Sequence, residues 1–153
     1  MQKLNILNTR EIKEIKELLE RQFGYTDKLD YAFLLGENGK LFIVNRDIEK
    51  IPLQNLRVDR YGLYFGELKN KELRLSMEGA WLIGSKAKRN TLKLNEEEIR
   101  KYFVGENLTK DVGEENRFIL LKFNEDIISC AKYKNGEILN FLPKIHRSRD
   151  LII

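Results

Sequence analysis

The sequence predicts an α+β protein, in which a helix-and-sheet domain at residues 1–88 precedes a small, mostly β barrel at residues 89–153. Two observations lead to this prediction. Each half has an amphipathic helix, together with short apolar runs separated by turns rich in Asn, Gly and Lys. Between the halves, residues 85–91 are polar and basic and have no apolar period, which favours a domain boundary there.

The first helix is expected to begin after Asn8, because Asn8 and Glu11 have the spacing of a capping box. Apolar residues then recur at helical spacing as far as Phe23, and Gly24 is suited to the left-handed position that ends a helix.

The rest of the first half predicts strands and one short helix. Asn38-Gly39 suits the positive φ of a tight hairpin turn, and Ser76 is expected to cap a short helix that Gly84 ends. The strands of this half are predicted at residues 31–35, 41–44, 56–58, 63–67 and 72–75.

The second half begins with a short strand at residues 92–94. Asn95 and Glu98 form a second capping-box spacing, so a helix is expected from there to Gly105. Mostly short strands with one helix favour a small closed or partly closed barrel. The remaining strands are predicted at residues 118–123, 127–131 and 138–142.

Charge is segregated along the chain, although the net charge is only +4. Residues 57–89 carry eight Lys or Arg against four acids, and residues 132–149 carry five against Glu137 alone. Residues 95–126, in contrast, carry nine acids against five bases. This segregation suits an oriented surface for an anionic partner, or it reflects chance patterning on solvated faces.

Aromatic and amide side chains lie among the basic residues, as in many surfaces that bind nucleic acids. The alternative is that Tyr64 and Phe141 belong to the core. The first cluster contains Arg57, Arg60, Tyr61, Tyr64, Lys69, Lys71 and Arg74. The second contains Lys132, Tyr133, Lys134, Asn135, Asn140, Phe141, Lys144, Arg147 and Arg149.

Several classes of site and location are disfavoured. No apolar run approaches the roughly 18–20 residues of a membrane helix, and the N-terminus has no signal-peptide pattern. The single cysteine, Cys130, excludes an internal disulfide, and together these points favour the cytoplasm. One Cys and one His do not make a metal site, and no glycine pattern of a nucleotide cofactor site is present. We therefore expect neither a cofactor nor a metal.

No convincing catalytic group emerges either. Cys130 lies in an apolar run and is interpreted as a small buried hydrophobe. Ser76 is expected at a helix start and Ser129 inside a strand, so neither is placed at the strained turn of a nucleophile.

From about residue 56 onward, several short motifs occur in the order found in one family. They are Gly66-Glu67, Leu73-Arg-Leu-Ser76 with Ala80-Trp-Leu82, Tyr102-Phe-Val-Gly-Glu106, Ile128-Ser-Cys-Ala-Lys132, and Asn135-Gly-Glu-Ile-Leu-Asn-Phe-Leu-Pro-Lys-Ile-His-Arg147. In this order they resemble the PUA-like RNA-binding domain at the C-terminus of RsmF-type rRNA 5-methylcytosine methyltransferases. The element order also resembles the Nip family of ribosome-biogenesis factors of archaea and eukaryotes, which join a helix-and-sheet domain to a PUA domain.

The resemblance implies a PUA-like barrel and a non-catalytic protein that binds rRNA or tRNA in ribosome biogenesis or RNA modification. A separate RNA methyltransferase or pre-ribosomal protein would be its partner. Two departures stand out. Ser129 and Ala131 replace family glycines, and the family's cofactor motif and Pro-Cys nucleophile have no counterpart. His146 falls where the family has an apolar residue, so we interpret it as a packing residue.

The predicted RNA contacts are basic side chains that would meet the phosphate backbone. The main candidates are Lys132, Lys134, Lys144, Arg147 and Arg149, and the secondary candidates are Arg74, Lys86, Lys88 and Arg89. Two other functions stay open. One is a protein–protein adaptor for a methyltransferase or pre-ribosomal factor, and the other is a small enzyme acting on a nucleotide or acidic metabolite.

Overall fold

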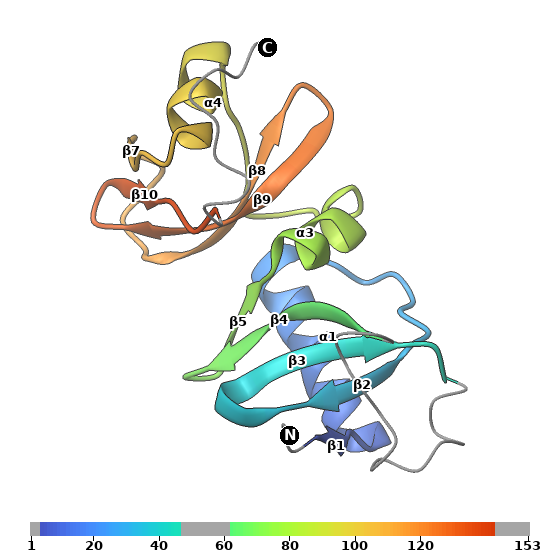
Figure 1. The fold of residues 1–153 in the computed structure, drawn as a ribbon. Coiled ribbons are helices and arrows are strands. Elements are labelled where there is room, and N and C mark those ends of the chain that lie inside the picture. The colour runs from blue at the N-terminus through green and yellow to red at the C-terminus, as the bar shows by residue number, and fades with distance from the viewer. Residues whose placement is uncertain (1–3, 47–61, 143–153) are drawn as a thin grey trace.

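The computed structural model describes residues 4–46 and 62–142, and it shows two five-stranded sheets with α3 between them (Figure 1). The predicted α+β class is confirmed. The predicted strand at residues 56–58 lies outside the described residues.

The first sheet has the spatial order β1-β2-β3-β4-β5, and all its neighbouring strands are antiparallel. Helix α1 (Thr9–Phe23) packs on one face of this sheet (Figure 1). The strands are β1 (Asn5–Ile6), β2 (Ala32–Leu35), β3 (Lys40–Val44), β4 (Leu63–Lys69) and β5 (Glu72–Leu75).

Local chemistry sets the limits of α1 as predicted. The Asn8 side chain accepts from the Glu11 N–H, the Glu11 carboxylate accepts from the Asn8 N–H, and Gly24 ends the helix at a φ of 63°. Ile15, Leu19 and Phe23 form the buried stripe. Between β2 and β3, a 3-10 turn (η1, Glu37–Gly39) places Asn38 and Gly39 at positive φ, as the hairpin prediction required.

Helix α3 (Met77–Gly84) follows β5 and connects the two sheets. The Ser76 side chain caps it by accepting from the Gly79 N–H at 2.9 Å. Gly79 packs against β4 so closely that a Cβ atom there would lie 2.2 Å from the Phe65 carbonyl oxygen. Only glycine allows this approach, which brings Ala80 and Ile83 into the core.

The second sheet has the order β6-β8-β9-β10-β7, in which β6 runs parallel to β8 and the other pairs are antiparallel. Its end strands β6 and β7 do not pair with each other, so the barrel is only partly closed. Its elements are β6 (Thr91–Lys93), α4 (Glu96–Phe103), β7 (Leu108–Thr109), β8 (Arg117–Phe123), β9 (Asp126–Lys134) and β10 (Glu137–Leu139).

The strand predictions differ from the structure at three kinds of place. β4 and β9 continue to Lys69 and Lys134, beyond the predicted ends at residues 67 and 131. β1 and β7 are two residues long, too short for an alternating pattern to show. β10 ends at Leu139 rather than continuing to 142, because Asn140 leaves the ladder. Its backbone N–H donates to Asn107, and its side chain donates to the carbonyls of Tyr102 and Glu106.

Two main hydrophobic cores occupy the described part of the chain. The first surrounds α1, α3 and the inner face of the first sheet, and it also includes Leu120 and Cys130 of the second sheet. The second lies between α4 and the opposite face of the second sheet, around Tyr102, Tyr133 and Ile138. The first core therefore continues across residues 85–91, the segment at which the chain passes from one sheet to the other.

Candidate nucleic-acid interface

Alternation along β9 separates core residues from surface cations. Ser129, Ala131 and Tyr133 are buried and point toward α4, while the residues between them face the other way. On that other face, Cys130 is buried in the first core, Lys132 is half-buried and Lys134 is exposed. The face thus runs from apolar to cationic as it leaves the cover of α3.

The first sheet presents a matching charged face on β4 and β5. Register places Glu67 opposite Arg74 and Lys69 opposite Glu72, so opposite charges face each other across the two strands. The intervening Leu73 and Leu75 are buried in the first core.

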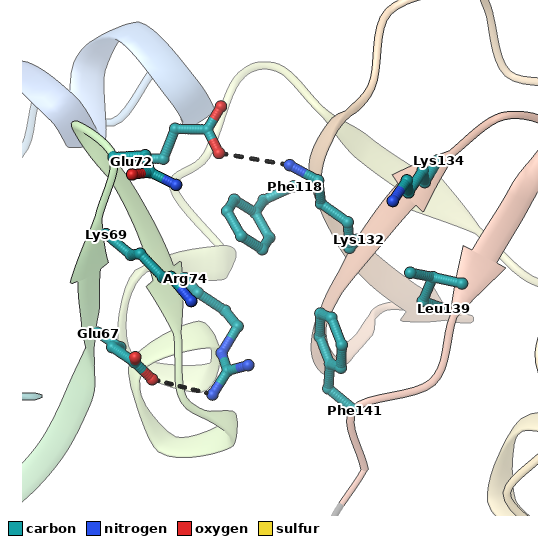
Figure 2. A pocket seen from close by; sticks show the side chains of 10 residues that line it. Glu67, Lys69, Glu72, Arg74, Phe118, Lys132, Lys134, Leu139 and Phe141 are labelled. Atoms are coloured by element: carbon teal, nitrogen blue, oxygen red, sulfur yellow. Dashed lines mark hydrogen bonds and ion pairs between the residues drawn. The ribbon is translucent and has the colours of Figure 1, made fainter. Parts of the chain in front are cut away.

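These two faces enclose a groove between the sheets, with a volume of about 450 Å³ (Figure 2). Four cations and two carboxylates line it, a net formal charge of +2, together with two phenyl rings. Its lining residues are Glu67, Lys69, Asn70, Glu72, Arg74, Phe118, Lys132, Lys134, Leu139 and Phe141. We call it the inter-sheet groove.

Arg74 is held by one partner from each sheet. Its Nη2 donates to Oε2 of Glu67 at 3.2 Å, and its guanidinium carbon lies 5.0 Å from the centre of the Phe141 ring. Both distances are within the ranges of an ion pair and a cation–π contact. The second contact crosses the groove, because Phe141 follows β10 and Arg74 belongs to β5 (Figure 2).

Lys132 also contacts a carboxylate and a ring, but here the carboxylate comes from the opposite sheet and the ring from the same sheet. Its ammonium lies 3.3 Å from Oε2 of Glu72 across the groove and 4.4 Å from the centre of the Phe118 ring on the neighbouring strand β8. In contrast, Lys69 and Lys134 are exposed and form no ion pair with the described residues.

The structure brings three predicted contacts, Arg74, Lys132 and Lys134, into this one groove. It places the other described candidates elsewhere, on the segment between α3 and β6. Lys86, Lys88 and Arg89 are exposed there, outside the lining of the groove. The predicted Lys144, Arg147 and Arg149, like His146, lie outside the described residues.

Arg89 borders a second hollow of about 360 Å³, which shares Glu72 and Phe118 with the inter-sheet groove. The guanidinium and the backbone of Arg89 both donate hydrogen bonds to carbonyl groups at the end of α1. The Nη1 donates to the Arg21 carbonyl at 3.3 Å, and the backbone N–H groups of Lys88 and Arg89 donate to the Phe23 carbonyl. The structure thus shows a helix-ending role for this segment.

Sequence reasoning missed Phe118, Glu67 and Glu72 as parts of this site. The predicted strand at residues 127–131 stopped short of Lys132 and Lys134, which β9 carries on the face away from the second core. Phe118 becomes a neighbour of Lys132 only through the β8–β9 register, which the sequence does not display. The alternative that Tyr64 and Phe141 belong to the core has a different outcome for each residue. Tyr64 is half-buried against the Phe42 ring and lies outside the lining of the groove, whereas Phe141 is 39% exposed at the groove.

Cys130 and Ser129 occupy structural positions. Burial raises the pKa of the Cys130 thiol to about 12, so the thiolate is not populated at neutral pH. The Ser129 hydroxyl lies 2.6 Å from the Tyr102 hydroxyl inside the second core. Ser129 and Ala131, which replace family glycines, therefore fill core space on the face away from the groove.

Two features are absent from residues 4–46 and 62–142, a cluster of metal ligands and a membrane-spanning helix. This part of the chain holds no group of three or more His, Cys, Asp or Glu side chains placed to bind a metal ion. None of its helices has the length and apolar character needed to span a membrane.

A comparison with known families finds a match in the second half of the chain. Residues 89–148 match the family model described as the methyltransferase RsmF PUA domain. The match supports a PUA-like domain of the RsmF type in this segment. The match confirms the resemblance over this segment and does not extend to the motifs between residues 56 and 88. A comparison with curated proteins found no match to the chain.

The PUA-like domain supports RNA binding in an RsmF-like context. It contributes Phe118, Lys132, Lys134, Leu139 and Phe141 to the inter-sheet groove, and β4, β5 and the turn between them contribute the remaining lining. The groove is thus built jointly by the matched and unmatched parts of the chain.

Proposed function

We propose that this protein binds rRNA or tRNA and adds no covalent chemistry of its own, serving RNA modification or ribosome biogenesis. A separate RNA methyltransferase or pre-ribosomal protein would act beside it. The observation that carries the proposal is the position of the PUA-like domain's own Lys132 and Lys134 in a cationic groove lined by aromatic rings. Such a surface neutralises phosphates and offers ring faces to bases.

The expected binding has a definite electrostatic signature. Each phosphate that a Lys or Arg neutralises releases condensed counterions, so the logarithm of affinity falls linearly with the logarithm of salt concentration. These contacts fix the position of the RNA and do not read its sequence. We therefore expect binding to rRNA and tRNA fragments that weakens steeply as salt rises.

The test is a salt series with rRNA and tRNA fragments, comparing the wild type with the Lys132→Ala/Lys134→Ala protein. We expect the double substitution to reduce the salt slope by about one unit or more. The matched control, Lys93→Ala/Lys101→Ala, removes two cations outside the groove and should change the slope little. Undetectable or salt-insensitive binding by the wild type would reject the function.

The same series tests the predicted contacts at the C-terminus. Lys144→Ala combined with Arg147→Ala should also weaken binding and flatten the slope by about one unit or more. An unchanged slope would assign the phosphate contacts to the groove and exclude these two residues.

A second function, docking of a partner protein, is favoured by one surface on α3. Trp81 is 49% exposed, although its Nε1 donates to the Ile128 carbonyl at 2.9 Å and holds the indole in place. A shallow hollow of about 440 Å³ adjoins it. The lining is Met77, Trp81, Ser85, Phe103, Glu125, Asp126, Ile127 and Ile128, with two carboxylates and no cation.

The negative charge of Glu125 and Asp126 disfavours RNA at this hollow. It suits a protein segment that combines a bulky apolar side chain with Lys or Arg. Trp81 is the only tryptophan of the chain, so its fluorescence reports on this surface directly. Adding a candidate methyltransferase that lacks tryptophan at its own contact should shift the emission to shorter wavelength, and Trp81→Ala should weaken the complex. RNA should produce no such shift. Equal affinity of wild type and Trp81→Ala for the partner would reject docking at this surface.

A further inference from the structure

Both cations in the middle of the inter-sheet groove share one arrangement. Arg74 lies between the Glu67 carboxylate and the Phe141 ring, and Lys132 lies between the Glu72 carboxylate and the Phe118 ring. Figure 2 shows the Lys132 set above the Arg74 set, and each set has groups from both sides of the groove. Each set thus contains a cation, a flat apolar surface and an anion that already satisfies the cation.

A nucleotide offers the two kinds of group that this arrangement accepts. Its base has a flat face that stacks on an aromatic ring, and its phosphate carries the negative charge that a carboxylate supplies in the free protein. The phosphate and the carboxylates compete for the same cations, because two anions close to one another repel. Glu67 and Glu72 are only partly buried, so solvent can receive them when they are displaced.

The size of the groove and the exposure of its rings suit one unpaired nucleotide as the part of the RNA that enters it. About 450 Å³ lies within the range of small-ligand sites, which are about 300–1,000 Å³. In a paired helix the base faces are stacked on one another and closed to side chains, whereas bases in bulges and loops can turn outward. Phe141, at 39% exposure, offers the more open ring.

We propose that the inter-sheet groove binds one unpaired nucleotide of an RNA. The base stacks on Phe141, where the Arg74 guanidinium lies in the free protein, and the phosphate replaces Glu67 and Glu72 as partner of Arg74 and Lys132. This inference rests on the proposed function, since it assigns the groove a part of the bound RNA. It also gives the two carboxylates a role, because they hold the cations in place in the free protein and lower the affinity of the groove for phosphate.

The first experiment compares two RNA hairpins that differ by a single bulged nucleotide, using fluorescence anisotropy. The wild type should bind the bulged hairpin about tenfold more tightly, the effect expected for stacking one base. Phe141→Leu, which keeps an apolar side chain but removes the ring, should abolish this preference. Phe141→Trp should restore it, and Phe118→Leu should reduce it.

The second experiment tests competition by the carboxylates. Glu67→Gln and Glu72→Gln remove the competing charges and should each raise the affinity for the bulged hairpin about threefold or more. Glu97→Gln is the matched control, since it removes one carboxylate that also pairs with a lysine, Lys101, at 3.5 Å on α4. It should change the affinity less than either groove substitution. Circular dichroism of each variant checks that the fold is retained.

The outcomes separate the two proposals. If the wild type binds both hairpins equally and Phe141→Leu has no effect, the groove does not take an unpaired nucleotide, although RNA binding stands. If the wild type binds neither hairpin, nor any rRNA or tRNA fragment across the salt series, the proposed function itself is wrong. Weaker binding by Glu67→Gln and Glu72→Gln would show that the carboxylates support the ligand and would overturn the competition.

Discussion

The ammonium of Lys132 lies 3.3 Å from a carboxylate oxygen of Glu72, although 60 positions separate the two residues in the chain. Lys132 belongs to the second sheet and Glu72 to the first, so the pair joins the two sides of the inter-sheet groove. A contact of this kind makes the relative position of the sheets part of the binding site.

Glu72→Gln is expected to lower the free energy of unfolding by less than about 1 kcal/mol, because partly exposed ion pairs contribute little. The Glu72 side chain is 44% exposed. Urea denaturation followed by circular dichroism measures the change. A small effect would allow any change in RNA affinity to be attributed to the groove, whereas a loss of several kcal/mol would show that the pair holds the two sheets together.

Arg74→Lys should lower RNA affinity while leaving the salt slope nearly unchanged. Lysine keeps the charge that meets a phosphate, but it lacks the planar guanidinium that can donate two parallel hydrogen bonds to one phosphate. Arg74→Ala should lower the affinity and also reduce the slope by about one unit. Anisotropy titrations at several salt concentrations give both quantities, and identical slopes for Ala and Lys would exclude a phosphate contact at this position.

Tyr102→Phe and Ser129→Ala should each destabilise the protein by about 1–3 kcal/mol, since each leaves a buried hydroxyl without this partner. The double substitution should cost clearly less than the two separate losses added together, because it removes both hydroxyls. A double-mutant cycle from urea denaturation measures the difference. Strict additivity would mean that the 2.6 Å contact contributes nothing.

Gly79→Ala should destabilise the protein by about 1–3 kcal/mol, because the added Cβ meets the Phe65 carbonyl oxygen and pushes α3 away from β4. The sign of the change in stability is informative, because inside an unconstrained helix the same substitution stabilises by about 1 kcal/mol. Thermal denaturation distinguishes the two cases, and a raised melting temperature would show that α3 does not pack this closely.

Glu98 should make the stability of the protein depend on pH in the acidic range. Burial alone raises the pKa of this carboxyl, but the N–H of Asn95 and the ion pair with Lys110 outweigh burial and hold the pKa below 4.5. The pKa of Glu98 is lower in the folded protein than in the unfolded chain. The stabilisation is therefore complete above about pH 4.5, and it is lost as pH falls through the pKa of the folded protein.

The measurement is urea denaturation of the wild type and Glu98→Gln at neutral pH and at pH values below 4.5. The wild type should be the more stable at neutral pH, and the difference should shrink toward acid. Glu97→Gln, on the same turn with a side chain that is 79% exposed, is the matched control for the loss of one carboxylate from α4. A difference that does not change with pH would contradict the assignment.

Much of the fold follows from local signals. The capping boxes at Asn8 and Asn95 define both helix starts as predicted, since the partners lie three residues apart in the chain. Turns such as Asn135-Gly136 have positive φ at both residues, the conformation that these residue types favour. The early end of β10 could not be predicted, because the groups that divert Asn140 come from residues 102–107.

The candidate site is divided in the same way between sequence and structure. The sequence alone determined which residues are cationic, that Lys132 and Lys134 belong to one basic cluster, and the motifs that resemble the PUA-like domain. Only the tertiary structure decided that Arg74 joins them while Lys86, Lys88 and Arg89 do not. The physical reason is that α3 and the shared first core set the position of β5 against β9, and such long-range packing leaves no periodic signal in the chain.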